Sequence, residues 1–273
     1  MARADAPPKQ RLTEAFAAGR AGSRALLMPF LVAGFPEEQT FVEVARACGE
    51  AGADVLEIGI PFSDPIMDGP VIQAAANHVL VRGGSTASMI ALAGEAAAAA
   101  GVPAVAMTYY NLLYGMGLDR FAAAIADAGL CGVIVPDLTV EESADWRKAC
   151  AAAGIASVFM ASVTSPDDRL RAIGEVSEGF VYAASQLGVT GVRREMSSRA
   201  RELVSRIRAA TDLPVAVGIG VSTPEHAADV ASYADGVIVG SALVKAVGDA
   251  KDPASGAREL VSALRSGIAE PRG

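Results

Sequence analysis

The chain has 273 residues, of which 52% are hydrophobic and only 5% aromatic, and its formal net charge is −8. An acidic surface repels the phosphates of nucleic acids and anionic membranes, so neither is expected as a partner. The longest apolar stretch, residues 25–35, contains Pro29 and Gly34 and is too short to cross a bilayer. A core of Ala, Val, Ile and Leu favours a sheet covered by helices.

Short apolar runs alternate with alanine-rich helical stretches along the whole chain. Eight runs are predicted as strands, at 25–33, 54–60, 104–110, 132–137, 156–162, 179–185, 214–220 and 235–241. Helices are predicted at 11–20, 37–51, 71–100 (broken near 83–84), 119–128, 141–153, 167–174, 198–211, 224–231, 242–247 and 252–266. This α/β alternation with short connections predicts a (β/α)8 TIM barrel with one extra N-terminal helix.

The alternative fold is an open, doubly wound sheet, but no Gly-x-Gly-x-x-Gly pattern follows the first predicted strand. No change of composition marks a second domain, so residues 9–268 are expected to form one barrel between disordered tails at 1–8 and 269–273. The polar N-terminus does not resemble a signal peptide. Three cysteines without a Cys-x-x-Cys pair are typical of a cytoplasmic protein with reduced thiols.

Glu57 is the most unusual residue of the predicted strands. Alternation places Val55, Glu57 and Gly59 on one face of the second strand, and Leu56 and Ile58 on the other. Glu57 therefore points into the barrel mouth among apolar neighbours, where a carboxyl group stays protonated more readily. The alternative is a structural glutamate paired with Arg or Lys, but the interior ends of the other strands offer no such residue. We therefore predict that Glu57 is a general acid.

The loop after this strand, residues 61–70, contains three prolines together with Asp64 and Asp68. A stiff acidic loop over a barrel mouth can place a second carboxylate against a substrate. Asp-Pro and Asp-Gly are also common turn formers. The spacing alone therefore leaves the role of Asp68 open, and it favours a turn-forming role for Asp64.

Glycines mark the ends of later strands. The seventh strand ends with Gly218 and Gly220, and the eighth ends with Gly240 and Ser241 just before the short helix at 242–247. Backbone N–H groups at such positions form the common phosphate site of barrels. A third glycine-bearing loop, at 187–196, is long enough to act as a mobile lid. These loops predict a phosphate-bearing substrate.

Other kinds of site are not indicated. The two histidines, His78 and His226, fall on predicted helices, and no cluster has metal-ligand spacing, so no metal is expected. No serine–histidine–aspartate arrangement occurs at the strand ends. No lysine is placed there for a Schiff base, since Lys245 lies beyond the eighth strand on a helix.

The segment Leu56-Glu-Ile-Gly-Ile-Pro-Phe-Ser-Asp-Pro-Ile-Met-Asp-Gly69 resembles the signature of the tryptophan synthase α subunit family. Further matching segments lie at 107–111, 135–138 with 141–143, 187–191, 222–225 and 240–245, so the resemblance covers residues 10–268. It implies a lyase that cleaves indole-3-glycerol phosphate by a retro-aldol reaction to indole and glyceraldehyde 3-phosphate. It also implies that no cofactor binds this chain, and that indole passes to a pyridoxal-phosphate-dependent β subunit in an α2β2 complex.

By position, the resemblance implies that Glu57 is the acid–base residue and Asp68 its partner carboxylate at the indole nitrogen. Substrate-binding roles are implied for Phe30, Tyr109, Tyr182, Thr190, Gly191, Gly220, Gly240 and Ser241. Among these, Thr190 is the lid residue that bonds Asp68 on closure, and the glycines and Ser241 contact phosphate. Positions facing the β subunit are Asp64, Pro65, Asn111 and the loop of Thr139.

The chain departs from the family pattern at four positions. Thr139 stands where the family usually has proline, in a loop that faces the partner. Ile219 replaces an aromatic residue, and Val32 and Phe35 replace Thr and Asp after the first strand. These three positions bear on the shape of the pocket.

Three other functions remain as alternatives. A stand-alone lyase that releases free indole would use the same residues. A non-catalytic activating subunit would not need both Glu57 and Asp68. A sugar-phosphate isomerase or aldolase would be expected to carry a lysine or histidine at a strand end.

Overall fold

The structure, a computed structural model, describes residues 6–184, 193–218 and 220–268. Within this part, nine short strands pair in parallel in the order β5-β4-β3-β2-β1-β9-β8-β7-β6. They are β1 (Leu26–Val32), β2 (Leu56–Gly59), β3 (Ala104–Met107), β4 (Gly132–Ile134), β5 (Ala156–Val158), β6 (Met160–Ser162), β7 (Val181–Ala184), β8 (Val215–Gly218) and β9 (Gly236–Val239). Each lies within one of the eight predicted runs.

The sheet closes into a barrel because its two outermost strands are consecutive pieces of the chain. β5 pairs with β4 and β6 pairs with β7, and only Phe159 separates the two pieces. The carbonyl of Phe159 accepts a hydrogen bond from the Tyr182 amide at 3.0 Å, so pairing is continuous across the interruption. The predicted fifth strand is thus present in two parts, and the eight-stranded parallel barrel is confirmed.

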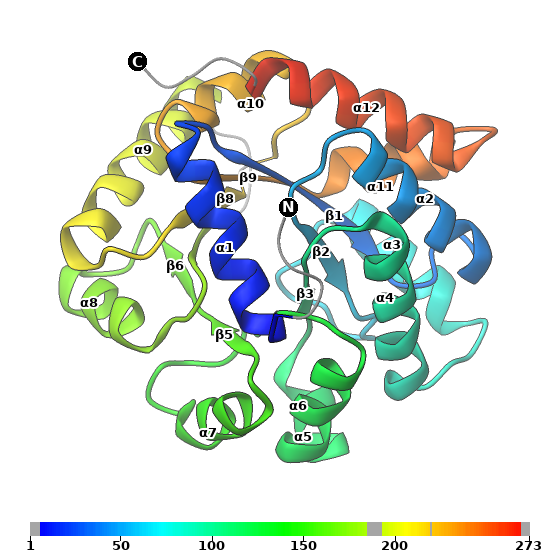
Figure 1. The fold of residues 1–273 in the computed structure, drawn as a ribbon, viewed down its shortest axis with the longest axis horizontal. Coiled ribbons are helices and arrows are strands. Elements are labelled where there is room, and N and C mark those ends of the chain that lie inside the picture. Colours follow the sequence, from blue (N-terminus) through cyan, green and yellow to red (C-terminus); the bar gives the residue numbers. More distant parts are fainter. Residues whose placement is uncertain (1–5, 185–192, 219, 269–273) are drawn as a thin grey trace.

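Helices surround the barrel (Figure 1). They are α1 (Pro8–Ala21), α2 (Glu38–Glu50), α3 (Pro70–Leu80), α4 (Thr86–Ala100), α5 (Tyr110–Met116), α6 (Leu118–Asp127), α7 (Ala144–Ala153), α8 (Asp167–Val176), α9 (Arg193–Ala210), α10 (Pro224–Ala231), α11 (Ser241–Asp249) and α12 (Pro253–Ile268). The predicted break near residues 83–84 is confirmed. Ser85 caps α4 there, since its hydroxyl and that of Ser88 each accept the other residue's amide. No helix in the described ranges is long and apolar enough to span a membrane.

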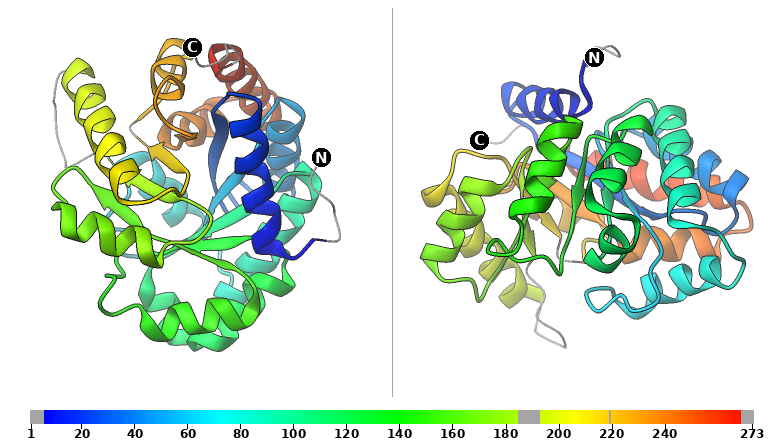
Figure 2. Two further views of the ribbon diagram at one scale, coloured as in Figure 1. Left: turned by 60° about the vertical axis from the view of Figure 1, so that its left-hand side comes forward. Right: turned by 90° about the horizontal axis from the view of Figure 1, so that it is seen from below.

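Helix α1 covers the end of the barrel at which the strands begin. Its Leu12 and Phe16 are fully buried and join the side chains of the barrel interior in one cluster. Phe16 packs on Phe180, just before β7, with ring centroids 5.2 Å apart. The right-hand view of Figure 2 shows α1 outside the barrel at one end. It starts three residues before the predicted helix, at Pro8, a favourable first position.

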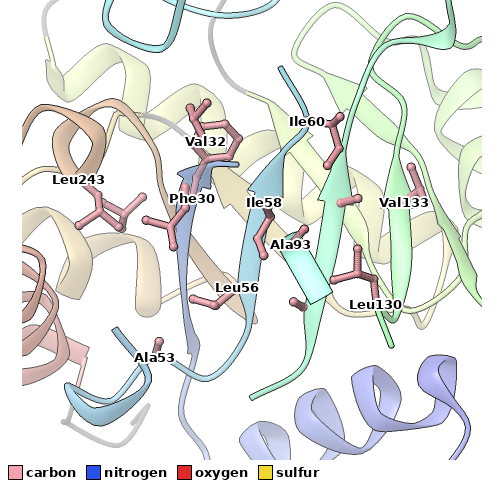
Figure 3. Packing of buried hydrophobic residues seen from close by; sticks show 14 of the residues in the cluster. Phe30, Val32, Ala53, Leu56, Ile58, Ile60, Ala93, Leu130, Val133 and Leu243 are labelled. Carbon is pink, nitrogen blue, oxygen red and sulfur yellow. The ribbon is translucent and has the colours of Figure 1, made fainter. Parts of the chain in front are cut away.

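Two apolar layers hold the fold together, and strand alternation separates them. Val55 points into the barrel interior, whereas Leu56 and Ile58 pack outward against the helices, as predicted. Figure 3 shows part of the outer layer, with Ile58 from a strand and Ala93 and Leu243 from helices. A glutamate on the same strand face as Val55 is therefore directed to the interior.

The sequence-based prediction was wrong for the segment after β3. The third strand ends at Met107 rather than at residue 110, and the unpredicted helix α5 begins at Tyr110. A seven-residue helix is too short to show a clear 3.6-residue period. It is stabilised by a tertiary contact, since the Asp137 carboxylate accepts a hydrogen bond from the Tyr110 amide at 2.9 Å.

Candidate active site

A cavity of about 170 Å³ lies at the carboxyl ends of the strands. Seven of the residues predicted from the sequence line it: Phe30, Glu57, Asp68, Tyr182, Gly220, Gly240 and Ser241. They come from β1, β2, β7, the loop after β2 and the loops after β8 and β9. The fold therefore brings together residues from both halves of the sequence at the carboxyl ends of the strands, where the active sites of such barrels lie.

Glu57 is 1% exposed, and its Oε2 has no hydrogen-bond partner among the described residues. Burial, together with the nearby charge of Asp68, raises the pKa of this carboxyl to about 8. A structural glutamate would instead show a cation or several donors at its oxygens. Glu57 is thus held mostly protonated near neutral pH, as a general acid needs.

Asp68 faces the same cavity but is only half-buried. Burial raises its pKa to about 6, while a hydrogen bond from the Tyr109 hydroxyl lowers it. Asp68 is therefore mostly ionised at neutral pH. The two carboxyl groups stand in different protonation states in one pocket, an arrangement that assigns an acid and a charge-stabilising role.

Tyr109 does not line the cavity but holds the loop that carries Asp68. Its side chain is 3% exposed and stacks on Phe62, with ring centroids 5.3 Å apart. The hydroxyl oxygen accepts a hydrogen bond from the Met67 amide at 3.0 Å. Tyr109 was expected to line the pocket. In the structure it lies behind the lining residues and interacts with Asp68, which does line the pocket.

Two glycines make room for the aromatic rings of the pocket. A Cβ on Gly218 would lie 2.4 Å from the Tyr182 hydroxyl oxygen, and one on Gly59 would lie 2.6 Å from Cζ of Phe30. Burial raises the pKa of Tyr182 well above its usual value, and the charges of Glu57 and Asp68 add to this effect. The hydroxyl therefore stays protonated and can donate a hydrogen bond into the cavity.

Another part of the cavity lining is formed by glycine backbone. Gly240 precedes α11, and Gly220 has a φ of +73°, in the region that favours glycine. A Cβ on Gly240 would find only Ile72 Cδ1, at 3.6 Å, so space rather than protein lies in front of it. The first N–H groups of α11 are unpaired within the helix and can bind an anion there.

Sequence reasoning missed the apolar part of the lining. It consists of Met67, Ile72, Met107, Met160, Ala184 and Ile238. Met107, for example, lies two residues after the inward-facing Val105, and the alternation that located Glu57 would also have located it. These side chains supply an apolar environment that suits an aromatic ring.

The residues expected at a partner interface are accessible. Asp64, Asn111 and Thr139 are exposed and Pro65 is partly exposed; they lie in the loop after β2, on α5 after β3, and in the loop after β4. Two large apolar side chains stand on the first two of these segments, Ile66 (76% exposed) and Tyr114 (74% exposed). Thr139, which stands in place of the usual proline, donates a hydrogen bond to Glu142 at 3.0 Å.

Other expectations have mixed outcomes. Val32 and Phe35 do not line the cavity. Val32 is buried in the outer apolar layer. The ring of Phe35 packs edge-on against that of His78, with ring centroids 5.6 Å apart. Thr190, Gly191 and Ile219, and most of the expected lid at 187–196, lie outside the described residues.

No metal centre is found in the ranges that the structure covers. There, no three His, Cys, Asp or Glu side chains gather closely enough to hold a metal ion. Both histidines are on helices, His78 on α3 and His226 on α10. Lys245 is exposed and pairs with Asp249 on α11, away from the carboxyl pair.

Known proteins resemble this chain over most of its length. The sequence model of a family described as tryptophan synthase alpha chain matches residues 16–269. The tryptophan synthase alpha chain of Streptomyces avermitilis is 47% identical over 96% of this chain and 94% of its own length. That of Acidothermus cellulolyticus is 48% identical over 93% and 96%.

Solved structures give the same result. A structure of Mycobacterium tuberculosis tryptophan synthase matches with a TM-score of 0.88 and 41% identity, over 96% of this chain and 99% of that one. The tryptophan synthase subunit alpha of Legionella pneumophila matches with a TM-score of 0.85 and 32% identity, over 94% and 98%. With its carboxyl pair, its barrel and these relatives, the chain belongs to the tryptophan synthase alpha chain family.

Proposed function

We propose that this chain is a carbon–carbon lyase, the α subunit of a tryptophan synthase, which cleaves indole-3-glycerol phosphate to indole and glyceraldehyde 3-phosphate. The observation that supports it most is the buried, unpaired Glu57 beside the ionised Asp68 in a pocket with apolar walls. This pair matches the two proton-dependent roles that the cleavage needs.

Glu57 supplies the proton that starts the reaction. It protonates C3 of the indole ring and so forms a cationic indolenine. As a carboxylate, it then accepts the proton of the glycerol hydroxyl. The carbon–carbon bond breaks, its electron pair returns to the ring, and the hydroxyl-bearing carbon becomes the aldehyde. Glu57 ends the cycle protonated, as it began.

Asp68 stabilises the positive charge that develops on the ring. Its ionised carboxylate accepts the indole N–H and interacts with the indolenine cation, while Glu57 works at C3. Tyr182 and Phe30 help to form the walls that orient the ring. Proton transfer by a positioned carboxyl group contributes about 10²- to 10⁴-fold to the rate.

The substrate phosphate binds at the glycine-bearing side of the pocket, against Gly220, Gly240, Ser241 and the N-terminus of α11. This places the phosphate and the indole ring on different walls, with the bond to be broken between them.

Replacing Gly240 with valine is expected to raise KM for indole-3-glycerol phosphate about tenfold or more, with a smaller change in kcat. A Cβ there meets no protein atom closer than 3.6 Å, so the fold tolerates it. It does block the approach of phosphate to the backbone N–H groups. Steady-state kinetics measure this change, and Gly115→Val on α5, where a Cβ also has open space, is the control. An unchanged KM would exclude a phosphate site at Gly240.

The partner is the β subunit, in an α2β2 complex. It contacts Asp64, Pro65, Asn111 and Thr139, and it covers the exposed Ile66 and Tyr114. The lyase reaction needs no cofactor on this chain, because pyridoxal phosphate belongs to the β subunit, which uses the indole.

The decisive experiment is an indole-release assay on indole-3-glycerol phosphate, with and without a β subunit. We expect slow cleavage by the chain alone and a large increase on adding the partner. Rapid release of indole without any partner would instead identify a stand-alone lyase. Activation of the β subunit without cleavage would identify a non-catalytic subunit.

We further propose that residues 9–268 act as one domain, since the first strand pairs with the last, with tails at both ends. The expected N-terminal tail at 1–8 is shorter by one residue, because Pro8 is the first residue of α1. A cytoplasmic location is proposed because Cys48, Cys131 and Cys150 are buried, unpaired thiols.

A further inference from the structure

Asp137 lies in the loop after β4 and has no role in the chemistry described above. Its Oδ1 accepts a hydrogen bond from the amide of Tyr110 at 2.9 Å. Tyr110 is the first residue of α5, and the residue before it, Tyr109, makes no side-chain capping bond to this helix. Asp137 therefore caps α5 from the neighbouring strand–helix unit.

The capped position is directly attached to Tyr109. The Tyr109 ring is held on one side by Phe62. Its hydroxyl oxygen is occupied as an acceptor by the Met67 amide. Met67 directly precedes Asp68 in the chain, so this bond fixes the loop that carries the carboxylate, and the Tyr109 hydroxyl favours the charged form of Asp68 by lowering its pKa. A continuous set of contacts thus leads from Asp137 through Tyr109 to Asp68.

We propose that Asp137 is a positioning residue for the cleavage reaction, and that it acts on Asp68 by fixing the place of Tyr109. The expected effect on the cleavage rate rests on the proposed function. The expected effect on the pKa of the Asp68 carboxyl can be measured without substrate and does not depend on that function.

The ionisation of Asp68 depends on few groups. Burial acts against the carboxylate, and the Tyr109 hydroxyl acts in its favour. Glu57 from β2 and Tyr182 from β7 also face it, and both are neutral when protonated. Asp137 is exposed and does not contact Asp68, so its effect passes through the position of Tyr109. A displacement of Tyr109 therefore weakens the interaction that favours the charged form of Asp68.

The test compares Asp137→Ala with Asp137→Asn in the full chain. The alanine removes the acceptor for the Tyr110 amide, whereas asparagine keeps an oxygen there and removes only the charge. We expect Asp137→Ala to lower kcat about three- to tenfold, in line with the loss of one capping bond, and to move the acid limb of the pH–rate profile to higher pH. Asp137→Asn should restore both values nearly to those of the wild type.

Asp252→Ala is the matched control. Asp252 is also an exposed carboxylate that accepts helix N-terminal amides, those of Ala254 and Ser255 at the start of α12. Its loss should lower the melting temperature about as much as Asp137→Ala does, without a change in kcat or in the pH profile. Equal kinetic effects of the two variants would show that Asp137 has only a structural role.

A double-mutant cycle that combines Asp137→Ala with Tyr109→Phe tests whether Asp137 acts on Asp68 through Tyr109. If Asp137 acts through Tyr109, then Asp137→Ala has little further effect once the hydroxyl is gone. Fully additive losses would overturn the proposal. A ¹³C NMR titration of the Asp68 carboxyl gives a readout without substrate: its pKa should rise in both Asp137→Ala and Tyr109→Phe. An unchanged Asp68 pKa in both variants would overturn the proposal, even if the wild type cleaves the substrate. A raised Asp68 pKa in a chain that cleaves no substrate would contradict only the proposed function.

Discussion

Glu57→Gln is expected to lower the rate of indole-3-glycerol phosphate cleavage by at least about 100-fold. Glutamine has nearly the same shape and fits the buried position, but it can neither deliver a proton to C3 of the ring nor accept one from the glycerol hydroxyl. Single-turnover measurement of indole release reports on the chemical step. Glu95→Gln, on an exposed position of α4, is the control for the loss of one carboxylate.

If Glu57→Gln retains more than about a tenth of the wild-type rate, Glu57 does not contribute the expected factor of about 100 to the cleavage rate. Substrate binding separates the remaining explanations. A variant that binds a non-cleavable analogue normally but does not turn over has lost the proton transfer, whereas a variant that no longer binds has lost the shape of the pocket.

The same substitution is expected to make the protein more stable at alkaline pH. The folded-state pKa of Glu57 is raised to about 8 by burial. The unfolded chain releases this proton near the ordinary glutamate pKa, while the folded chain retains it until the higher value. The free energy of unfolding of the wild type therefore falls as the pH rises through this interval, and Glu57→Gln lacks that loss. Between pH 5 and pH 8 the variant should gain roughly 3 to 4 kcal/mol relative to the wild type.

Urea unfolding at the two pH values measures this difference. Glu95→Gln should follow the wild type at both, because its carboxylate is exposed in the folded and the unfolded state alike. A constant difference in stability between Glu57→Gln and the wild type from pH 5 to pH 8 would mean that Glu57 ionises normally. The acid role would then have no physical basis.

Most of the fold could be predicted because it depends on local periodicity. Every described strand falls within a predicted apolar run, since each is covered by helices and must be apolar. Two features depended on tertiary contacts and could not be predicted. The fifth strand is interrupted at Phe159, where the barrel pairing continues through a backbone carbonyl. Helix α5 requires Asp137, which is 27 positions away from the amide that it caps.

The site could be predicted only in part, for a similar reason. Glu57 was identified from alternation alone, because a charged residue on an inward strand face is physically costly. Asp68 lies in an irregular loop with no period, so its role followed from the family resemblance. The hydrogen bond that Tyr109 gives to Asp68 joins two loops, and no spacing in the sequence indicates it.

Helix α1 has a consequence for the traffic of molecules through the barrel. Leu12 and Phe16 fill the end at which the strands begin, and the interior behind the pocket is packed with the same apolar cluster. Among the described residues the chamber is therefore closed at that end, and substrate and products pass at the carboxyl ends of the strands. The loop after β2 carries Asp64 and Ile66 as well as the pocket residues Met67 and Asp68, and Asn111 lies on α5, which follows β3. A subunit docked on these residues lies beside the carboxyl ends of the strands, so an uncharged, apolar product such as indole can pass into that neighbour without first reaching bulk water.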